Sequence, residues 1–195
     1  MKKGFTLLEL LIVIGILAIL SAVTILVINP AELLRKSRDT QRISDLGSIN
    51  SALGYYITNT ATVSATGLGL STVSYSYNAL TTCGANRTGP AIAIQKVDGT
   101  GWIPVPMSTL VDGSPISSLP VDPNSLTTGA SFRYYVYVTN GQTYWQLAAN
   151  LESTYYTSTD NREASDGGSV ANLYEVGNNL TLIPSVSSTC FGAGN

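Results

Sequence analysis

The chain has 195 residues, a formal net charge of −2 and 11% charged residues, well below the typical quarter. A weak and slightly acidic charge gives no electrostatic basis for binding nucleic acid. The sequence has no histidine, which excludes the Ser–His and Cys–His arrangements of nucleophilic enzymes and removes the commonest metal ligand. We therefore predict no enzyme and no cofactor, apart from the calcium considered below.

The first distinctive stretch lies at the N-terminus. After two lysines and a glycine, residues Phe5 to Ile28 carry one charge only, that of Glu9. A helix of this length would span about 36 Å, enough to cross a bilayer core with some tilt. The buried helix of a soluble protein would rarely be this long and this apolar on every side. We therefore predict a membrane-spanning helix over residues 5–29.

Glu9 separates this segment from a plain anchor. A carboxylate inside an apolar span costs about 2.5–3.5 kcal/mol at the helix centre, and less near its end. A cleaved secretory signal does not fit either, since its apolar run is only about 7–15 residues and ends at a small-residue cleavage site. If the chain were cut after Gly4, the new ammonium of Phe5 would lie one helical turn from a Glu9 carboxylate, on the same or a neighbouring chain.

The segment KKGFTLLELL at residues 2–11 resembles the class III signal of type IV pilins and type II secretion pseudopilins. This resemblance implies that a prepilin peptidase cuts between Gly4 and Phe5 and N-methylates Phe5, and that Glu9 guides assembly into a helical filament. It also implies a cytoplasmic N-terminus with the main domain outside, although counting lysines and arginines alone favours the reverse orientation.

A helix-start signal follows the apolar span. Asn29 can cap a helix, Pro30 suits a first turn, and Glu32 lies three residues after the cap. The helix is therefore expected either to kink here or to stop and restart. Proteins with the class III signal often carry a helix-breaking proline earlier, at about the position of Leu26, so this chain departs from that pattern.

Residues 30–58 are predicted to form a second, amphipathic helix. Its first part, residues 31–42, is mostly polar and offers the pairs Glu32–Lys36 and Arg35–Asp39, which predicts a solvated collar just outside the membrane. From there on, apolar residues recur at steps of three and four: Ile43, Leu46, Ile49, Leu53 and Tyr56. This stripe needs a partner surface, and we expect a C-terminal sheet to supply it.

The remaining residues, 59–195, are predicted to form an exported, β-rich globular domain. We interpret residues 59–86 as a long loop with a short strand or two. Ala91 to Val97 is predicted to be a strand that ends in the turn Asp98-Gly99, and five prolines within residues 101–123 indicate loop or edge structure.

The clearest hairpin signal lies in residues 132–150, with Asn140-Gly141 as a two-residue turn. Pairing outward from this turn sets Tyr134 opposite Leu147 on an apolar face and leaves the other face mixed. This hairpin and the segment SLPVDP at residues 118–123 are similar to major pseudopilins. The predicted fold is thus α+β and pilin-like, with a long N-terminal helix packed on a C-terminal antiparallel sheet.

Two candidate sites remain in the exported part. Oxygen ligands gather in a glycine-containing loop, at Asp160, Asn161, Glu163 and Asp166, and similarity to major pseudopilins favours calcium there. The EF-hand spacing fails at Arg162, and a solvated acidic loop is the alternative.

The two cysteines, Cys83 and Cys190, both lie in the exported part. An even number of exported cysteines predicts a disulfide, with two buried thiols as the alternative. Such a bond would tie the C-terminus to the loop after the helix.

These observations predict a leader at residues 1–4 and a structural subunit of a type IV pilus or of a type II secretion-like pseudopilus. Its expected partners are prepilin peptidase, further copies of itself, other pilins or pseudopilins, the assembly platform and the membrane. The expected location is the inner membrane as a single-pass precursor, then a cell-surface or extracellular filament. The alternatives are a membrane-tethered binding module that acts as a monomer and, without support from residue spacing, a hydrolase.

Overall fold

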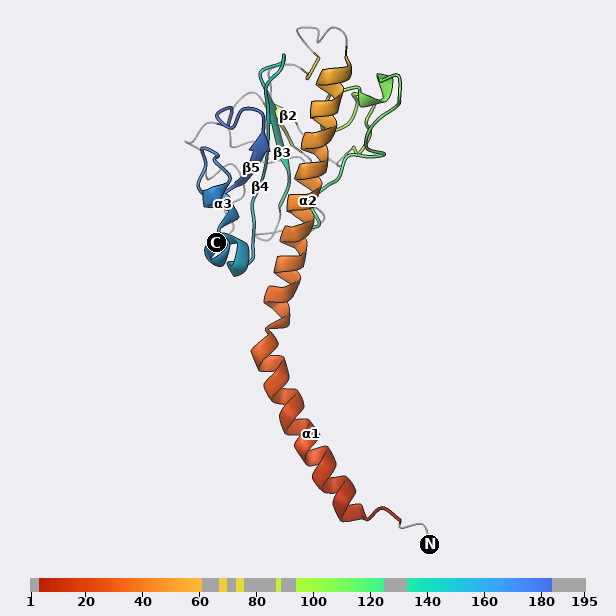
Figure 1. The fold of residues 1–195 in the computed structure, drawn as a ribbon, viewed down its shortest axis with the longest axis vertical. Coiled ribbons are helices and arrows are strands. Elements are labelled where there is room, and N and C mark those ends of the chain that lie inside the picture. Colours follow the sequence, from red (N-terminus) through yellow and green to blue (C-terminus); the bar gives the residue numbers. More distant parts are fainter. Residues whose placement is uncertain are drawn as a thin grey trace.

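The computed structural model describes residues 4–60, 67–69, 73–75, 87–88, 94–124 and 133–183. Two long helices form a bent rod, α1 (Leu7–Ile28) and α2 (Pro30–Asn59), and a head of strands and loops packs on α2 alone (Figure 1). Cys83 and Cys190 fall outside the described residues, so the predicted disulfide stays a prediction.

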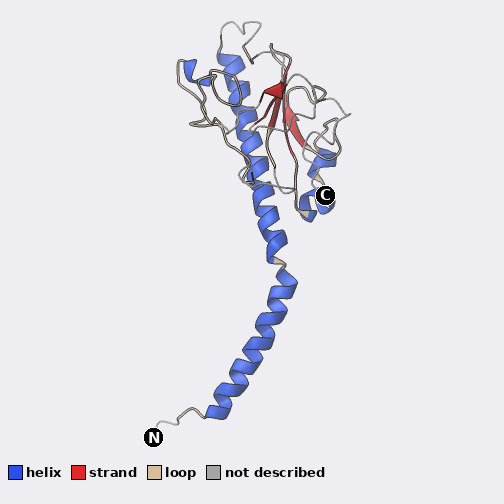
Figure 2. Ribbon diagram, turned by 180° about the vertical axis from the view of Figure 1, so that it is seen from behind, coloured by secondary structure: helices blue, strands red, loops and turns tan. Residues whose placement is uncertain are grey.

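A single residue separates the two helices. Asn29 has a left-handed backbone with φ 44°, so it ends α1 and at the same time caps α2. Its side-chain oxygen accepts the backbone N–H of Glu32 at 3.4 Å, and Pro30 is the first residue of α2. Of the two expected alternatives, the helix stops and restarts, and the rod bends at this point (Figure 2).

The head contains a five-stranded sheet in the order β2-β1-β3-β4-β5. Neighbouring strands are antiparallel except for β1 and β2, which are parallel. The predicted α+β fold, with a long helix on a largely antiparallel sheet, is confirmed. The strands and short helices are β1 (Val73–Tyr75), β2 (Arg87–Thr88), the 3-10 helix η1 (Met107–Thr109), β3 (Val136–Thr139), β4 (Trp145–Ala149), the π-helix η2 (Tyr155–Thr159), α3 (Arg162–Ser165) and β5 (Tyr174–Gly177).

The strand predicted over Ala91–Val97 is wrong in its described part, residues 94–97, which have no strand structure. Their carbonyl groups bond to a loop instead of a ladder, since Ile94 O accepts from Trp102 N at 3.0 Å and Gln95 O accepts from Leu119 N at 2.8 Å. The turn that follows forms as predicted, with Gly99 at φ 90°.

The hairpin of β3 and β4 forms, but its predicted register is wrong. Thr139 pairs with Trp145, so the connection is the five residues 140–144 rather than a two-residue turn. The Asn140 side-chain oxygen accepts three backbone N–H groups, those of residues 142, 143 and 144, at 3.0–3.1 Å. This local cap stabilises the longer loop, and Gly141 supplies the positive φ of 83° that the loop requires.

The changed register also changes which side chains face the helix. Tyr135 and Tyr137 lie in the same core cluster as Leu147 and the residues of α2, whereas Val136 and Val138 lie on the opposite face of the sheet. That opposite face is also buried, under Val170, Leu173 and Ile183. The prediction of one apolar and one mixed face is therefore wrong, because both faces are covered.

Three parts of the chain contribute side chains to the core next to α2: the helix itself, the sheet and the proline-rich segment 94–124. The predicted stripe on the helix is buried at Leu46, Ile49, Leu53 and Tyr56, while Ile43 is only half-buried. The sheet covers this stripe from one side, and the proline-rich segment 94–124 lies on another side of α2 (Figure 1). Residues 101–123 form loop structure as predicted, interrupted by η1, yet they contribute some of the most buried side chains: Trp102, Ile103, Val105, Met107 and Leu119.

Candidate assembly site: the exposed apolar helix and the head it carries

Helix α1 has no partner within the described part of the chain. Residues Leu7–Ile25 have a mean hydropathy of 2.7 and none of them is buried. Among the described residues, this is the one helix that is long and apolar enough to cross a membrane. Large aliphatic side chains such as Leu7 (86% exposed) and Ile19 (68%) project on all sides of it.

The polar groups of α1 bond to the helix itself. The Ser21 hydroxyl donates to Leu17 O at 2.7 Å, and the Thr24 hydroxyl donates to Ser21 O at 2.9 Å. An apolar surface with its hydroxyl groups satisfied suits lipid or other helices rather than water. Helix α1 is therefore compatible with a single-pass inner-membrane precursor.

The N-terminus of α1 holds the predicted assembly residue in a capping box. Thr6 Oγ1 accepts the backbone N–H of Glu9 at 3.2 Å, and Glu9 Oε2 accepts both the Thr6 backbone N–H at 3.0 Å and the Thr6 hydroxyl at 2.9 Å. Thr6 was missed as a partner in the sequence analysis, although the spacing T-x-x-E signals it. The capping box places the carboxylate one turn from the predicted cleavage bond between Gly4 and Phe5.

The first turns of α2 contain a buried cluster of charges. The Arg42 guanidinium is fully buried and donates to Asp122 through Nε (2.7 Å) and Nη2 (2.9 Å), and to Asp39 through Nη1 at 2.7 Å. Glu152 accepts from Arg42 at 2.8 Å and from Arg38 at 2.6 and 2.9 Å. The predicted solvated collar is therefore wrong at its most important positions, since Asp39 and Arg42 have no exposed surface.

This cluster joins distant segments to the helix. The Asp39 carboxylate also accepts the backbone N–H groups of Glu152 and Ser153, at 3.1 and 2.7 Å. Burial alone would raise the pKa of Glu152, but the hydrogen bonds from Arg38 and Arg42 lower this pKa to about 2. The carboxylate therefore stays ionised at neutral pH and keeps the head fixed on the start of α2.

Just below the cluster, α2 contacts the π-helix η2. Glu32 Oε1 accepts the backbone N–H of Tyr155 at 3.2 Å, and Lys36 Nζ lies 3.4 Å from the centroid of the Tyr155 ring. The ion pair of Glu32 is with Arg35, at 3.8 Å. Residues of the expected collar thus bind the head, and the predicted pair Glu32–Lys36 is not the one that forms.

The four predicted calcium ligands lie near one another along the chain but bind different protein groups. Asp160 pairs with Arg162 at 2.9 Å, and Asn161 caps α3 by accepting the N–H of Ala164. Glu163 is buried and accepts the backbone N–H of Leu151 at 2.9 Å.

Asp166 accepts the backbone N–H groups of Gly168 and Glu175 at 2.8 and 2.6 Å. No group of three or more acidic, cysteine or histidine side chains within the described ranges could hold a metal ion. These side chains bond to protein groups in the structure, and calcium binding stays a prediction for a titration to test.

Comparison with known proteins identifies the N-terminal segment. Residues 1–25 match the model of the prokaryotic N-terminal methylation motif, which is the class III signal of type IV pilins and pseudopilins. No curated protein and no solved structure matches the chain. The motif covers the predicted leader and most of α1, and it agrees with the exposed, apolar helix of the structure. It indicates that the chain is the precursor of a type IV pilin-like protein or a pseudopilin.

Proposed function

We propose that the protein is a structural subunit of a type IV pilus or of a type II secretion-like pseudopilus. The observation that supports this most strongly is helix α1, because its apolar side chains over Leu7–Ile25 are exposed and the hydroxyl groups of Ser21 and Thr24 are satisfied within the helix. A helix of this kind needs lipid in the precursor and other helices after it leaves the membrane.

Processing by prepilin peptidase would prepare this helix for assembly. A cut between Gly4 and Phe5 removes Lys2 and Lys3 and creates an ammonium group at Phe5. In the precursor, the capping box occupies the Glu9 carboxylate with Thr6. After the cut, the carboxylate of one subunit can pair with the ammonium of its neighbour. A paired charge in a dry bundle sets register more than it adds stability, so Glu9 should govern assembly rather than folding.

The head would then lie outside the helical bundle. It packs only on α2, and the break at Asn29 lets the rod bend between the bundle and the head (Figure 1). The partners in this proposal are the peptidase, further copies of the chain, other pilins or pseudopilins and the assembly platform. The final location is a cell-surface or extracellular filament.

The first experiment is mass spectrometry of the N-terminus of protein from the native membrane or surface fraction. The expected result is a chain that begins with methylated Phe5. Gly4→Ser should leave the leader uncleaved and abolish filaments. Gly54→Ser is the matched control, because a side chain at Gly54 has open space and lies outside the signal.

An intact Met1 or Lys2 terminus in the native protein would contradict the proposal. It would favour a plain single-pass anchor, and a monomeric tethered binding module would then be the better interpretation. Cleaved protein that never enters a filament would support processing but contradict the structural role.

A further inference from the structure

One exposed face of α2 carries no charged residue along most of the helix. Seven exposed residues recur there at steps of three or four, which places them on a single face. The charged residues of α2 lie on its other faces, where several bind the head. The seven residues, called the uncharged strip below, are Leu33, Ser37, Gln41, Ser44, Ser48, Ser51 and Tyr55.

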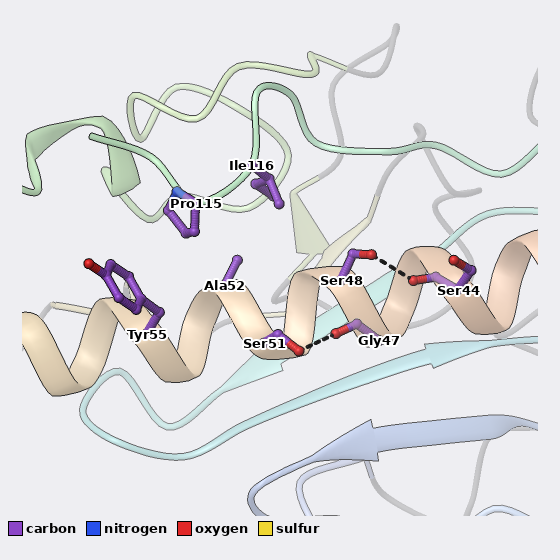
Figure 3. Close-up of a pocket in the computed structure, with 8 residues that line it drawn as sticks. All are labelled: Ser44, Gly47, Ser48, Ser51, Ala52, Tyr55, Pro115 and Ile116. Carbon is purple, nitrogen blue, oxygen red and sulfur yellow. Dashed lines mark hydrogen bonds between the residues drawn. The ribbon is translucent and has the colours of Figure 1, made fainter. Parts of the chain in front are cut away.

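The upper half of this strip forms the floor of a groove. The groove has a volume of about 670 Å³, and its second wall is Pro115 and Ile116 of the segment 94–124 (Figure 3). The floor contains small side chains, so a partner helix could approach the backbone of α2 closely. At the far end, Tyr55 donates its hydroxyl to Asp112 at 3.1 Å, which fixes the loop that carries the second wall.

Two of the three serine hydroxyl groups on the floor donate within the helix. Ser48 Oγ donates to Ser44 O and Ser51 Oγ donates to Gly47 O, each at 2.9 Å (Figure 3). Ser21 and Thr24 of α1 do the same within the membrane-spanning helix. The part of the floor formed by Ser48 and Ser51 therefore loses little when an apolar surface covers it.

We propose that this groove receives helix α1 of a second copy of the chain in the filament. This proposal rests on the proposed function, because it requires subunits that assemble through α1. A second α1 is the expected occupant because the apolar surface of α1 continues onto α2. Leu33 and Leu34 are 60% and 61% exposed, and they extend that surface past Asn29 to the uncharged strip.

Two further observations favour a second copy. The chain's own α1 leaves α2 through one residue and points away from the head, so it cannot reach the groove (Figures 1 and 2). The side chains also differ in size, since α1 presents large exposed leucine and isoleucine side chains and the floor of the groove presents mostly small ones. Large side chains of one helix that pack between small ones of another give close contact between the two backbones.

The test is photo-crosslinking in assembled filaments. A benzophenone amino acid replaces Ser48 in the full chain, and the crosslinked peptides are identified by mass spectrometry. The expected partner is the segment Leu7–Ile28 of a second copy. The matched control is the same replacement at Ser158, an exposed residue of η2, which should give no crosslink to that segment. Crosslinks from Ser48 to a head domain, to a different protein or to nothing would overturn the proposal.

Charged variants give a second readout. Ser48→Arg and Ser51→Arg would bury an unpaired charge under the partner helix, so sheared filaments should fall by at least about tenfold. Ser158→Arg should leave them unchanged. A normal filament yield for both groove variants would contradict the groove's role. The two proposals remain distinguishable, because absent filaments in the unmodified protein contradict the proposed function, whereas intact filaments without the expected crosslink contradict only this inference.

Discussion

Helices α1 and α2 are separated by one residue but place apolar and charged groups in opposite ways. In α1, apolar side chains are exposed on every side, and the single carboxylate, that of Glu9, bonds to its neighbour Thr6. In α2, the apolar stripe from Leu46 to Tyr56 is buried. The charges of Asp39 and Arg42 are buried too, and they bond to residues 80 or more positions away or to each other.

This difference reflects what surrounds each helix. The side chains of α1 face away from the rest of the described chain, and a surface that is apolar with its polar groups satisfied locally suits lipid or other helices. Helix α2 serves as the inner wall of the head, where buried charges are tolerated only with partners on several sides. One helix is thus built for contacts between molecules, and the other mainly for contacts within the molecule.

The largest effect is expected from Glu9→Ala, which removes the only charge of the apolar span. Filaments should be lost completely, because the proposed assembly requires the Glu9 carboxylate to pair with the Phe5 ammonium of a neighbouring subunit. The head should stay folded, since Glu9 makes no contact with it. Sheared filaments, N-terminal mass and protease resistance of the head are the measurements. Wild-type filament yield in this variant would contradict the assembly role of Glu9.

The next largest effect should come from Arg42→Ala in the head. Removing the guanidinium leaves the carboxylates of Asp39 and Asp122 buried without it, so the free energy of unfolding should fall by about 3–5 kcal/mol. Urea unfolding of the full chain in detergent, followed by fluorescence of the buried Trp102 and Trp145, measures this. The control is Arg162→Ala, which breaks an exposed pair and should leave the midpoint unchanged.

A smaller effect should appear as a pH dependence of the same unfolding. The folded-state pKa of Glu152 is lowered to about 2 from an ordinary value of 4.5. Its contribution to the free energy of unfolding is therefore fully present above pH 4.5. That contribution is lost as the pH falls from about 4.5 to about 2. The urea midpoint should decrease over this range, and Glu152→Gln should make it less dependent on pH there. An equally steep decrease in the variant would show that other carboxylates control acid unfolding.

The smallest effect is expected at the break between the two helices. Asn29→Ala removes the side-chain cap of α2 and leaves at φ 44° a residue that tolerates the left-handed region less well than asparagine does, which should cost about 1 kcal/mol. Asn29→Gly loses the cap but tolerates the backbone, so its effect should be smaller. Hydrogen exchange of the amides in residues 30–34 measures the difference. Equal exchange in both variants would show that neither the cap nor the backbone angle stabilises the break.

Sequence reasoning predicted the elements whose signals are local. The long apolar run, the Asn29-Pro30 helix start and the apolar stripe of α2 each depend on residues a few positions apart, and the structure confirms all three. The hairpin was found but not its register. An Asn-Gly pair favours a two-residue turn, whereas here the Asn140 side chain caps a five-residue connection.

The candidate site also has one part that local sequence signals predict and another part that depends on distant segments. The sequence by itself determined the N-terminal methylation motif, which includes Gly4, Phe5 and Glu9, and the long apolar helix, because each is a property of consecutive residues. Only the tertiary structure decided that Arg42 is buried and that a groove lies beside Ser48. Both depend on segments 60 to 110 positions away, which bring Asp122, Glu152 and Pro115 against one helix. Charge periodicity along α2 cannot reveal such partners, because burial of a charge depends on what packs against it.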